Sequence, residues 1–106
     1  MNTGRKSISD HGMKLLVMAK NGDKLAEEDL IAYIRDNFMG RRIGRYYGKN
    51  RQVETDDIKQ EFLIGVAMGI RNAKMDIGDP IEYIIHRGVY NVRGYMRKHI
   101  VQNTFQ

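Results

Sequence analysis

Residues 79–99 read DPIEYIIHRGVYNVRGYMRKH and contain the strongest structural signal in this chain of 106 residues. Asp79 is a preferred helix N-cap, Pro80 suits the first helical position, and Glu82 stands three residues after the cap. At about 100° per residue, one apolar face would hold Ile81, Ile84, Ile85, Gly88, Val92 and Met96. The segment therefore predicts a long amphipathic helix that ends at about His99.

The opposite face of this predicted helix is aromatic and basic. It carries Tyr83, His86, Arg87, Tyr90, Arg93 and Arg97, and Lys98 adds one more cation. Single-stranded nucleic acids bind to such surfaces because bases stack on the rings and arginines hold the phosphates. The alternative is that the tyrosines lie flat against a neighbouring helix with their hydroxyls in water. Periodicity alone leaves both interpretations open.

Three further segments have helical periodicity, and the alternation typical of strands is hard to find. The first covers residues 10–20, and the second begins at Asp23, a preferred type of N-cap, and runs toward Gly48. The third follows the acidic turn of residues 54–57 and places Ile58, Phe62, Val66 and Ile70 at four-residue spacing. The sequence predicts an all-α fold, a compact bundle of three to four helices.

The length fits a single small domain. We expect a flexible N-terminus over residues 1–9, one helical domain over residues 10–100 and a C-terminal tail over residues 101–106. The chain has no cysteine, which excludes disulfides and cysteine-ligated zinc. The longest purely apolar run, residues 15–19, is too short to span a membrane, and the polar N-terminus lacks the apolar core of a signal peptide. We therefore expect a cytoplasmic protein.

Glycines recur inside the predicted helices, where each costs about 1 kcal/mol relative to alanine. They are Gly40, Gly44, Gly48, Gly65, Gly69, Gly88 and Gly94. The favoured interpretation is tight contact between helices. The alternative is close approach to the backbone of a ligand.

Charge is segregated along the chain, whose net charge is +5. A first basic block without acids contains Arg41, Arg42, Arg45, Lys49 and Arg51. An acidic block over residues 53–62 follows, and residues 84–106 are again basic and free of acids. Such blocks can be ordinary solvated helix faces. They can also mean that the acidic block meets a basic protein partner while the basic blocks face nucleic acid.

No catalytic arrangement is evident. The serines are confined to Ser7 and Ser9, and the histidines lack the spacing of metal ligands. Because no nucleophile and base are paired, we expect a protein that is not an enzyme and that uses no metal and no cofactor.

Three phrases, in order along the chain, resemble the bacterial sigma-70 family, and in particular its short extracytoplasmic-function type. Residues 19–26, AKNGDKLA, look like the phrase that opens the first conserved helix of these factors. Residues 57–63, DIKQEFL, are similar to the start of the next conserved helix. Residues 83–98 resemble the helix that melts and recognises the −10 promoter element.

The resemblance implies a sigma region 2 domain without region 4. It implies that Asp57, Gln60 and Glu61 dock on the β′ clamp helices of core RNA polymerase. It also implies that the last helix captures non-template bases of promoter DNA through Tyr83, His86, Arg87, Tyr90, Arg93, Arg97 and Lys98. The preceding loop, residues 72–79, would be the specificity loop.

The chain departs from this family in two respects. Primary sigma factors carry a tryptophan pair where this chain has His86 and Arg87, and the chain contains no tryptophan. The sequence also has no room for region 4, so a second protein would supply that function, as in phage or split-sigma systems. Two alternatives stay open: a sigma mimic that occupies polymerase and inhibits or redirects transcription, and a stand-alone helical DNA-binding regulator.

Overall fold

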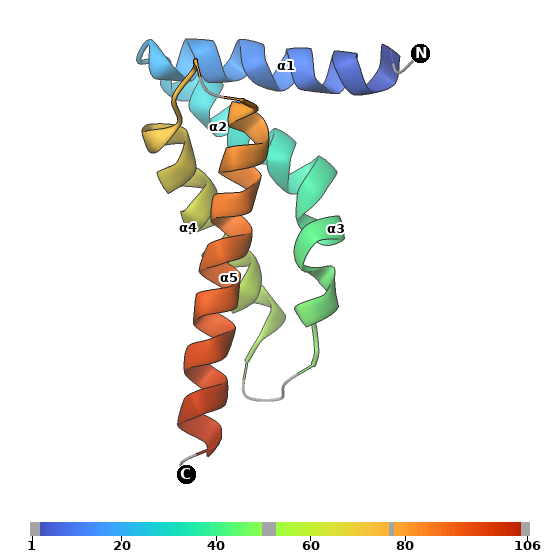
Figure 1. Ribbon diagram of the computed structural model, residues 1–106, viewed down its shortest axis with the longest axis vertical. Coiled ribbons are helices and arrows are strands. Elements are labelled where there is room, and N and C mark those ends of the chain that lie inside the picture. Colours follow the sequence, from blue (N-terminus) through green and yellow to red (C-terminus); the bar gives the residue numbers. More distant parts are fainter. Residues whose placement is uncertain (1–2, 50–52, 77, 105–106) are drawn as a thin grey trace.

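The computed structural model describes residues 3–49, 53–76 and 78–104, and every regular element in these ranges is helical. The α-helices are α1 (Thr3–Lys20), α2 (Lys24–Ile34), α3 (Gly40–Ile43), α4 (Thr55–Asn72) and α5 (Pro80–Thr104). The predicted all-α class is confirmed, and the long helices form a small bundle (Figure 1). None of the described helices is both long and apolar enough to pass through a bilayer.

Two aspartates start helices as predicted. The Asp23 carboxylate accepts a hydrogen bond of 3.0 Å from the Ala26 amide, and the Asp79 carboxylate accepts one of 3.1 Å from the Glu82 amide. Each bond satisfies an amide that the first helical turn leaves without a backbone partner. The caps therefore fix where α2 and α5 begin.

The outer ends of α1 and α5 extend beyond their predicted limits. Helix α1 begins at Thr3, so most of the segment expected to be a flexible N-terminus, residues 1–9, is helical. Helix α5 continues through most of the expected tail to Thr104 instead of ending near His99. The only proline of the chain is Pro80, so neither extension meets the residue that most strongly stops a helix.

The segment from α2 to α3 is helical over about its predicted length but changes its winding twice. A π-helical turn, η1 (Arg35–Met39), separates α2 from α3, and a 3₁₀ turn, η2 (Gly44–Tyr46), follows α3. A π turn inserts an extra residue and so rotates the side chains that follow it. Gly48 then turns the chain away with a φ of 67°, a value that favours glycine.

Helices α4 and α5 form an antiparallel pair whose backbones touch. A Cβ atom on Gly65 would lie 2.6 Å from the carbonyl oxygen of Arg87, and one on Gly88 would lie 2.8 Å from the Phe62 ring. Gly69 meets Ile84 in the same way, with a Cβ–Cα distance of 3.0 Å. Tight helix–helix contact, as predicted for these three glycines, is confirmed.

The same prediction is wrong for Gly48, which lies in a turn and whose added Cβ would meet no atom within 4 Å, and for three further glycines. A Cβ atom added to Gly40, Gly44 or Gly94 would meet no atom within 4 Å. These positions lie on outer helix surfaces, where no neighbouring described helix packs against them. Packing within the described chain therefore gives no reason for glycine there.

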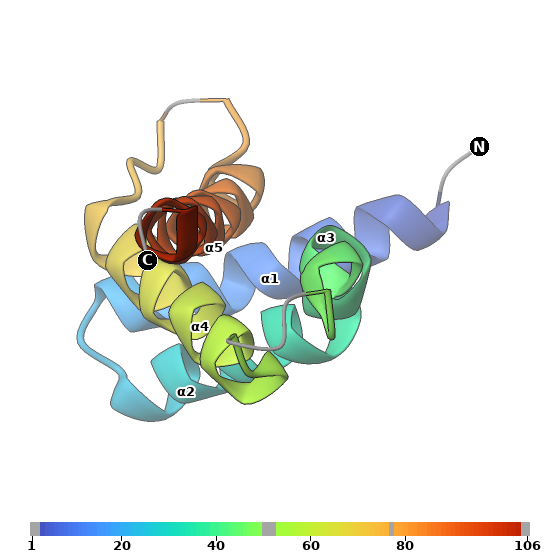
Figure 2. The same cartoon turned by 90° about the horizontal axis from the view of Figure 1, so that it is seen from below.

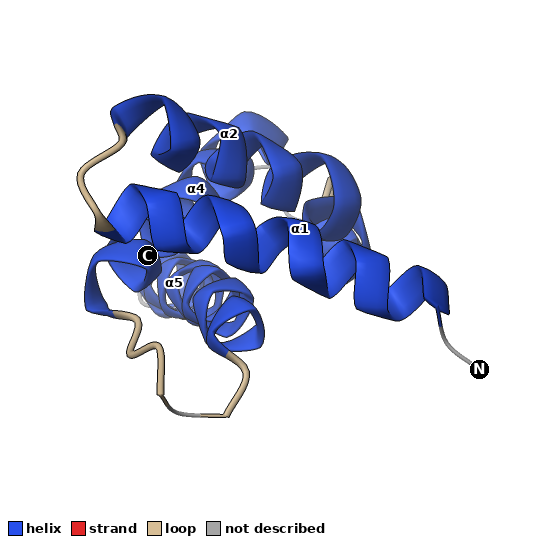
Figure 3. Cartoon of the chain, turned by 90° about the horizontal axis from the view of Figure 1, so that it is seen from above, coloured by secondary structure: helices blue, strands red, loops and turns tan. Residues whose placement is uncertain are grey.

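Helix α1 lies across one end of the bundle (Figures 1 and 3). A Cβ atom on Gly12 would lie 3.2 Å from Ile81 of α5 and 3.4 Å from the Tyr33 ring of α2. At the end of α1, the Lys20 amine donates hydrogen bonds to the carbonyls of Ile70, at 3.3 Å, and Arg71, at 3.0 Å. Lys20 thereby caps the C-terminus of α4, where a cation also suits the helix dipole.

The core is apolar and runs between α4, α5 and the covering helices. All six residues of the predicted apolar face of α5 are buried, and so is Val89, which the sequence pattern missed. Phe62, Ile58 and Val66 meet them from α4, and Leu16 and Leu30 cover them from α1 and α2. This packing directs the opposite sides of α4 and α5 toward solvent.

Candidate functional site

The outer side of α5 presents the predicted aromatic and basic residues. Tyr83 is 44% exposed and Tyr90 is 65% exposed, which rules out that Tyr90 lies flat against a neighbouring helix. His86, Arg93, Arg97 and Lys98 are exposed, and Arg87 is half-buried. We call these seven residues the aromatic–basic face.

The centre of this face is a shallow apolar pocket of about 250 Å³, lined by Tyr83, His86, Arg87 and Tyr90. The Arg87 guanidinium lies 5.5 Å from the centre of the Tyr90 ring, within the range of a cation–π interaction. The guanidinium therefore lies over one face of the ring, and the tyrosine is still 65% exposed. A planar base could stack there next to a positive charge.

A second concavity lies between α3 and α5, which run side by side in Figures 1 and 2. This α3–α5 cleft has a volume of about 270 Å³ and is lined by Arg41, Arg42, Arg45, His86, Val89 and Arg93. Residues from the first basic block thus meet residues from the aromatic–basic face. Two clusters that lie about 40 residues apart in sequence form one positive surface.

Arg42 is an exception within this surface. Its guanidinium forms an ion pair of 2.6 Å with the Glu82 carboxylate on the first turn of α5. The predicted capping box is thus realised through Asp79, whereas the side chain of Glu82 is used to attach α3 to α5. Arg42 of the first basic block is therefore engaged in an ion pair within the protein. Lys49 is exposed, and Arg51 lies outside the described residues.

Tyr46, which the sequence pattern did not single out, interacts with Arg45 and Arg93. Its hydroxyl accepts a hydrogen bond of 3.2 Å from Arg45, whose guanidinium lies 5.1 Å from the centre of the ring. Burial raises the pKa of Tyr46, but hydrogen bonding to Arg93 and Arg45 lowers it by more, so the net pKa is lowered. The close succession of three arginines and two tyrosines over residues 41–47, RRIGRYY, was the sequence signal for this cluster.

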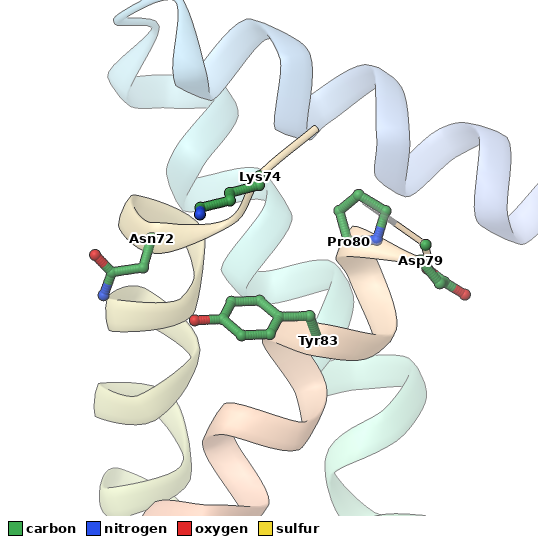
Figure 4. A pocket seen from close by; sticks show the side chains of 6 residues that line it. Asn72, Lys74, Asp79, Pro80 and Tyr83 are labelled. Carbon is green, nitrogen blue, oxygen red and sulfur yellow. The ribbon is translucent and has the colours of Figure 1, made fainter. Parts of the chain in front are cut away.

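The loop between α4 and α5 encloses a larger hollow of about 460 Å³ (Figure 4). Its lining includes Asn72 at the end of α4, Lys74 in the loop and Tyr83 on α5. Figure 4 shows the Tyr83 ring extended toward Asn72, while Asp79 points away from the ring. The predicted specificity loop and the first tyrosine of the aromatic–basic face therefore share one hollow.

The three residues assigned to polymerase lie on the first turns of α4. Asp57 and Gln60 are exposed and Glu61 is half-buried. Burial raises the pKa of Tyr95 on α5, and the neighbouring carboxylates of Asp57 and Glu61 raise it further. The carboxylates of Asp57 and Glu61 are thus neighbours of the Tyr95 side chain of α5. Ile64 and Met68, 45% and 37% exposed, continue the same side of α4.

Comparison of the chain with protein-family models, with curated proteins and with solved structures finds no match. The aromatic–basic face, the α3–α5 cleft and the acidic turns of α4 are therefore interpreted from their own geometry and chemistry.

Proposed function

We propose that this protein is a sigma-like transcription factor of the cytoplasm. It binds the β′ clamp helices of core RNA polymerase through Asp57, Gln60 and Glu61. Its aromatic–basic face receives the non-template strand of a −10-like promoter element. A second protein supplies the function of region 4, or the system works without it.

The observation that carries this proposal is the composition of the outer side of α5. Two exposed tyrosines stand among four arginines and lysines there, and the nearby Glu82 carboxylate is paired with Arg42. The surface can therefore stack bases and hold phosphates without repulsion from an unpaired acid at this position. This combination is typical of single-strand recognition.

The hollow beside Tyr83 supports the same function. Its volume of about 460 Å³ is within the range of small-molecule sites, and an aromatic ring forms one wall. An enzyme or factor that takes a base out of a duplex needs a pocket of this kind to offset the lost stacking. The loop of residues 72–79 is then where sequence preference is set.

The acidic turns of α4 support the polymerase contact. Asp57 and Gln60 are accessible, and the acids lie where the positive end of the helix dipole stabilises negative charge. A partner helix rich in arginine or lysine would complement this surface. The contact between α4 and α5 fixes the distance between the partner-binding and DNA-binding surfaces.

A pull-down with core RNA polymerase tests the protein contact. We expect the wild-type chain to be retained, and Glu61→Arg or Asp57→Ala to reduce retention at least about tenfold, as for truncation of one partner in an interfacial charge pair. Asp29→Arg, which changes an exposed acid on α2, is the matched control and should bind normally. Normal retention of the Glu61 and Asp57 variants would remove the basis for this contact.

In vitro transcription tests the DNA contact and separates the alternatives. The double variant Tyr83→Ala, Tyr90→Ala should still bind polymerase but lose promoter opening. If the wild type inhibits all promoters and the double variant inhibits equally, the protein is a sigma mimic. If it binds duplex DNA as tightly as single strands and ignores polymerase, it is a stand-alone regulator.

A further inference from the structure

Four arginines line the α3–α5 cleft, and the neutral hydroxyl of Tyr46 interacts with two of them, Arg45 and Arg93. Arg45 from η2 and Arg93 from α5 both act on the Tyr46 hydroxyl, and Arg41 lines the same cleft. Glu82, the carboxylate at the edge of the cleft, is already bonded to Arg42. Arg45 and Arg93 therefore share a neutral hydroxyl, which cannot neutralise their charge.

Like charges held close together destabilise a free protein, and a bound anion removes that repulsion. Guanidinium groups hold phosphate oxygens with particular geometric fit, because their N–H donors form a planar fork. The position of the cleft also matters. It shares His86 with the apolar pocket of Tyr83, Arg87 and Tyr90, so a ligand in the cleft lies next to exposed rings.

We propose that the α3–α5 cleft is a phosphate-binding site in which Arg41, Arg45 and Arg93 hold one phosphodiester of a nucleic-acid strand. The base next to that phosphate stacks on Tyr90, so the strand crosses α5 from the cleft toward the apolar pocket. Tyr46 is a positioning residue, because its hydroxyl orients Arg45 and Arg93. This inference rests on the nucleic-acid part of the proposed function and is independent of polymerase binding.

The site is tested with the purified full chain and a fluorescein-labelled single-stranded oligonucleotide, by anisotropy at several salt concentrations. Each phosphate contact contributes about 0.7 to the slope of log affinity against log salt for single strands. Because the cleft holds one phosphate, Arg45→Gln and Arg93→Gln should each weaken binding and lower the slope by part of that amount, and the double variant should lower it by about 0.7. Tyr90→Ala should weaken binding about tenfold with an unchanged slope, because it removes stacking and no charge.

Lys24→Gln is the matched control, since it removes one exposed cation from the first turn of α2. It should leave both slope and affinity nearly unchanged. If Arg45→Gln and Arg93→Gln behave like Lys24→Gln, the cleft holds no phosphate of the strand and the proposal is overturned.

Competition distinguishes a strand phosphate from a free phosphate. Inorganic phosphate and a mononucleotide, at matched ionic strength, should displace the labelled oligonucleotide only weakly, whereas an unlabelled oligonucleotide should displace it fully. Strong displacement by inorganic phosphate that depends on Arg93 would identify a small-anion site and overturn the assignment to a strand.

Thermal unfolding excludes misfolding as the cause of lost binding. Arg45→Gln and Arg93→Gln should unfold at the wild-type temperature or above it, because each relieves repulsion in the empty cleft.

Tyr46→Phe should weaken oligonucleotide binding in the wild-type background but add little to Arg93→Gln, which is the non-additivity expected of residues that act as one unit. Full additivity would remove the positioning role. Arg45→Gln, Arg93→Gln and Tyr46→Phe should all still be retained on polymerase. Loss of oligonucleotide binding with retained polymerase binding would be specific to the phosphate site.

Discussion

Some glycines of this protein are required for helix packing and others are not, and two single substitutions distinguish the two kinds. Gly65→Ala places a Cβ atom 2.6 Å from the Arg87 carbonyl oxygen, a backbone atom that cannot move away without shifting α5. We expect a loss of about 2–3 kcal/mol in the free energy of unfolding, at the upper end for overpacked cores. Urea unfolding followed by circular dichroism measures it.

Gly94→Ala is the matched comparison, because its Cβ would meet no atom within 4 Å on an outer surface of α5. Alanine is favoured over glycine within a helix, so the variant should gain up to about 1 kcal/mol. Equal effects of the two substitutions would contradict the packing described for the α4–α5 pair.

At this scale the sequence indicates which residues are unusual but not what they contact. Its prediction of tight helix–helix contact is confirmed for Gly65, Gly69 and Gly88. The same prediction is wrong for Gly40, Gly44, Gly48 and Gly94. A glycine is required only where another helix packs against it. The local sequence pattern contains no information on which helix that is. Tyr46 was missed for the same reason, since Arg93 reaches its hydroxyl from another helix.

At the scale of elements, Lys20 connects the end of α1 to the end of α4. Lys20→Met keeps most of the aliphatic stem but removes the hydrogen bonds to the carbonyls of Ile70 and Arg71. We expect a loss of about 1 kcal/mol in the free energy of unfolding, because two carbonyls at the helix end lose their capping donor. Chemical denaturation of the variant and the wild type measures the difference.

Lys24→Met is the control for that experiment. Lys24 lies in the first turn of α2, where a cation is unfavourable to the helix dipole, so its removal should be neutral or slightly stabilising. If Lys20→Met also proves neutral, the cap contributes nothing to stability in solution.

Helix starts were predictable, whereas changes of winding were not. Asp23 and Asp79 act on amides three residues away, so a short window of sequence contains the whole interaction. The π turn between α2 and α3 depends instead on how this segment packs against the rest of the bundle. The same is true of Glu82, whose partner Arg42 lies 40 residues earlier in the chain.

For the whole molecule, the tyrosines predict sensitivity to alkaline pH. Burial raises the pKa of Tyr33, Tyr47 and Tyr95 above the ordinary value of about 10. A raised pKa in the folded state contributes stability below pH 10 that is lost as pH rises through the raised values. Tyr46, with its lowered pKa, acts in the opposite sense and offsets part of the loss.

The free energy of unfolding should therefore fall between pH 9 and pH 11.5, as measured by urea titration at fixed ionic strength, with tyrosine ionisation near pH 10 as its cause. Tyr47→Phe should make this fall smaller. It should also stabilise the protein at neutral pH, because the buried Tyr47 hydroxyl has no hydrogen-bond partner among the described residues. An unchanged fall in the variant would show that Tyr47 does not contribute.

The whole-molecule arrangement sets how far the sequence could lead toward the site. Periodicity placed the aromatic–basic residues on one side of α5 because all of them belong to a single helix. It could not place Arg41 and Arg45 beside Arg93, because the relation of α3 to α5 is fixed by tertiary packing and by the Arg42–Glu82 pair. Charge segregation indicated that these blocks matter, and the fold brings two of them together.

The direct backbone contact between α4 and α5 has a mechanical consequence. Gly65 lies against the backbone of Arg87 and Gly88, and Gly88 lies against the ring and backbone of Phe62, so only one side chain, the Phe62 ring, lies between the helices at these contacts. If either helix shifted along the other by one residue, a side chain would clash with a backbone carbonyl. The packing therefore resists sliding of α4 against α5. A displacement of the acidic turns of α4 should therefore move the outer side of α5 with it.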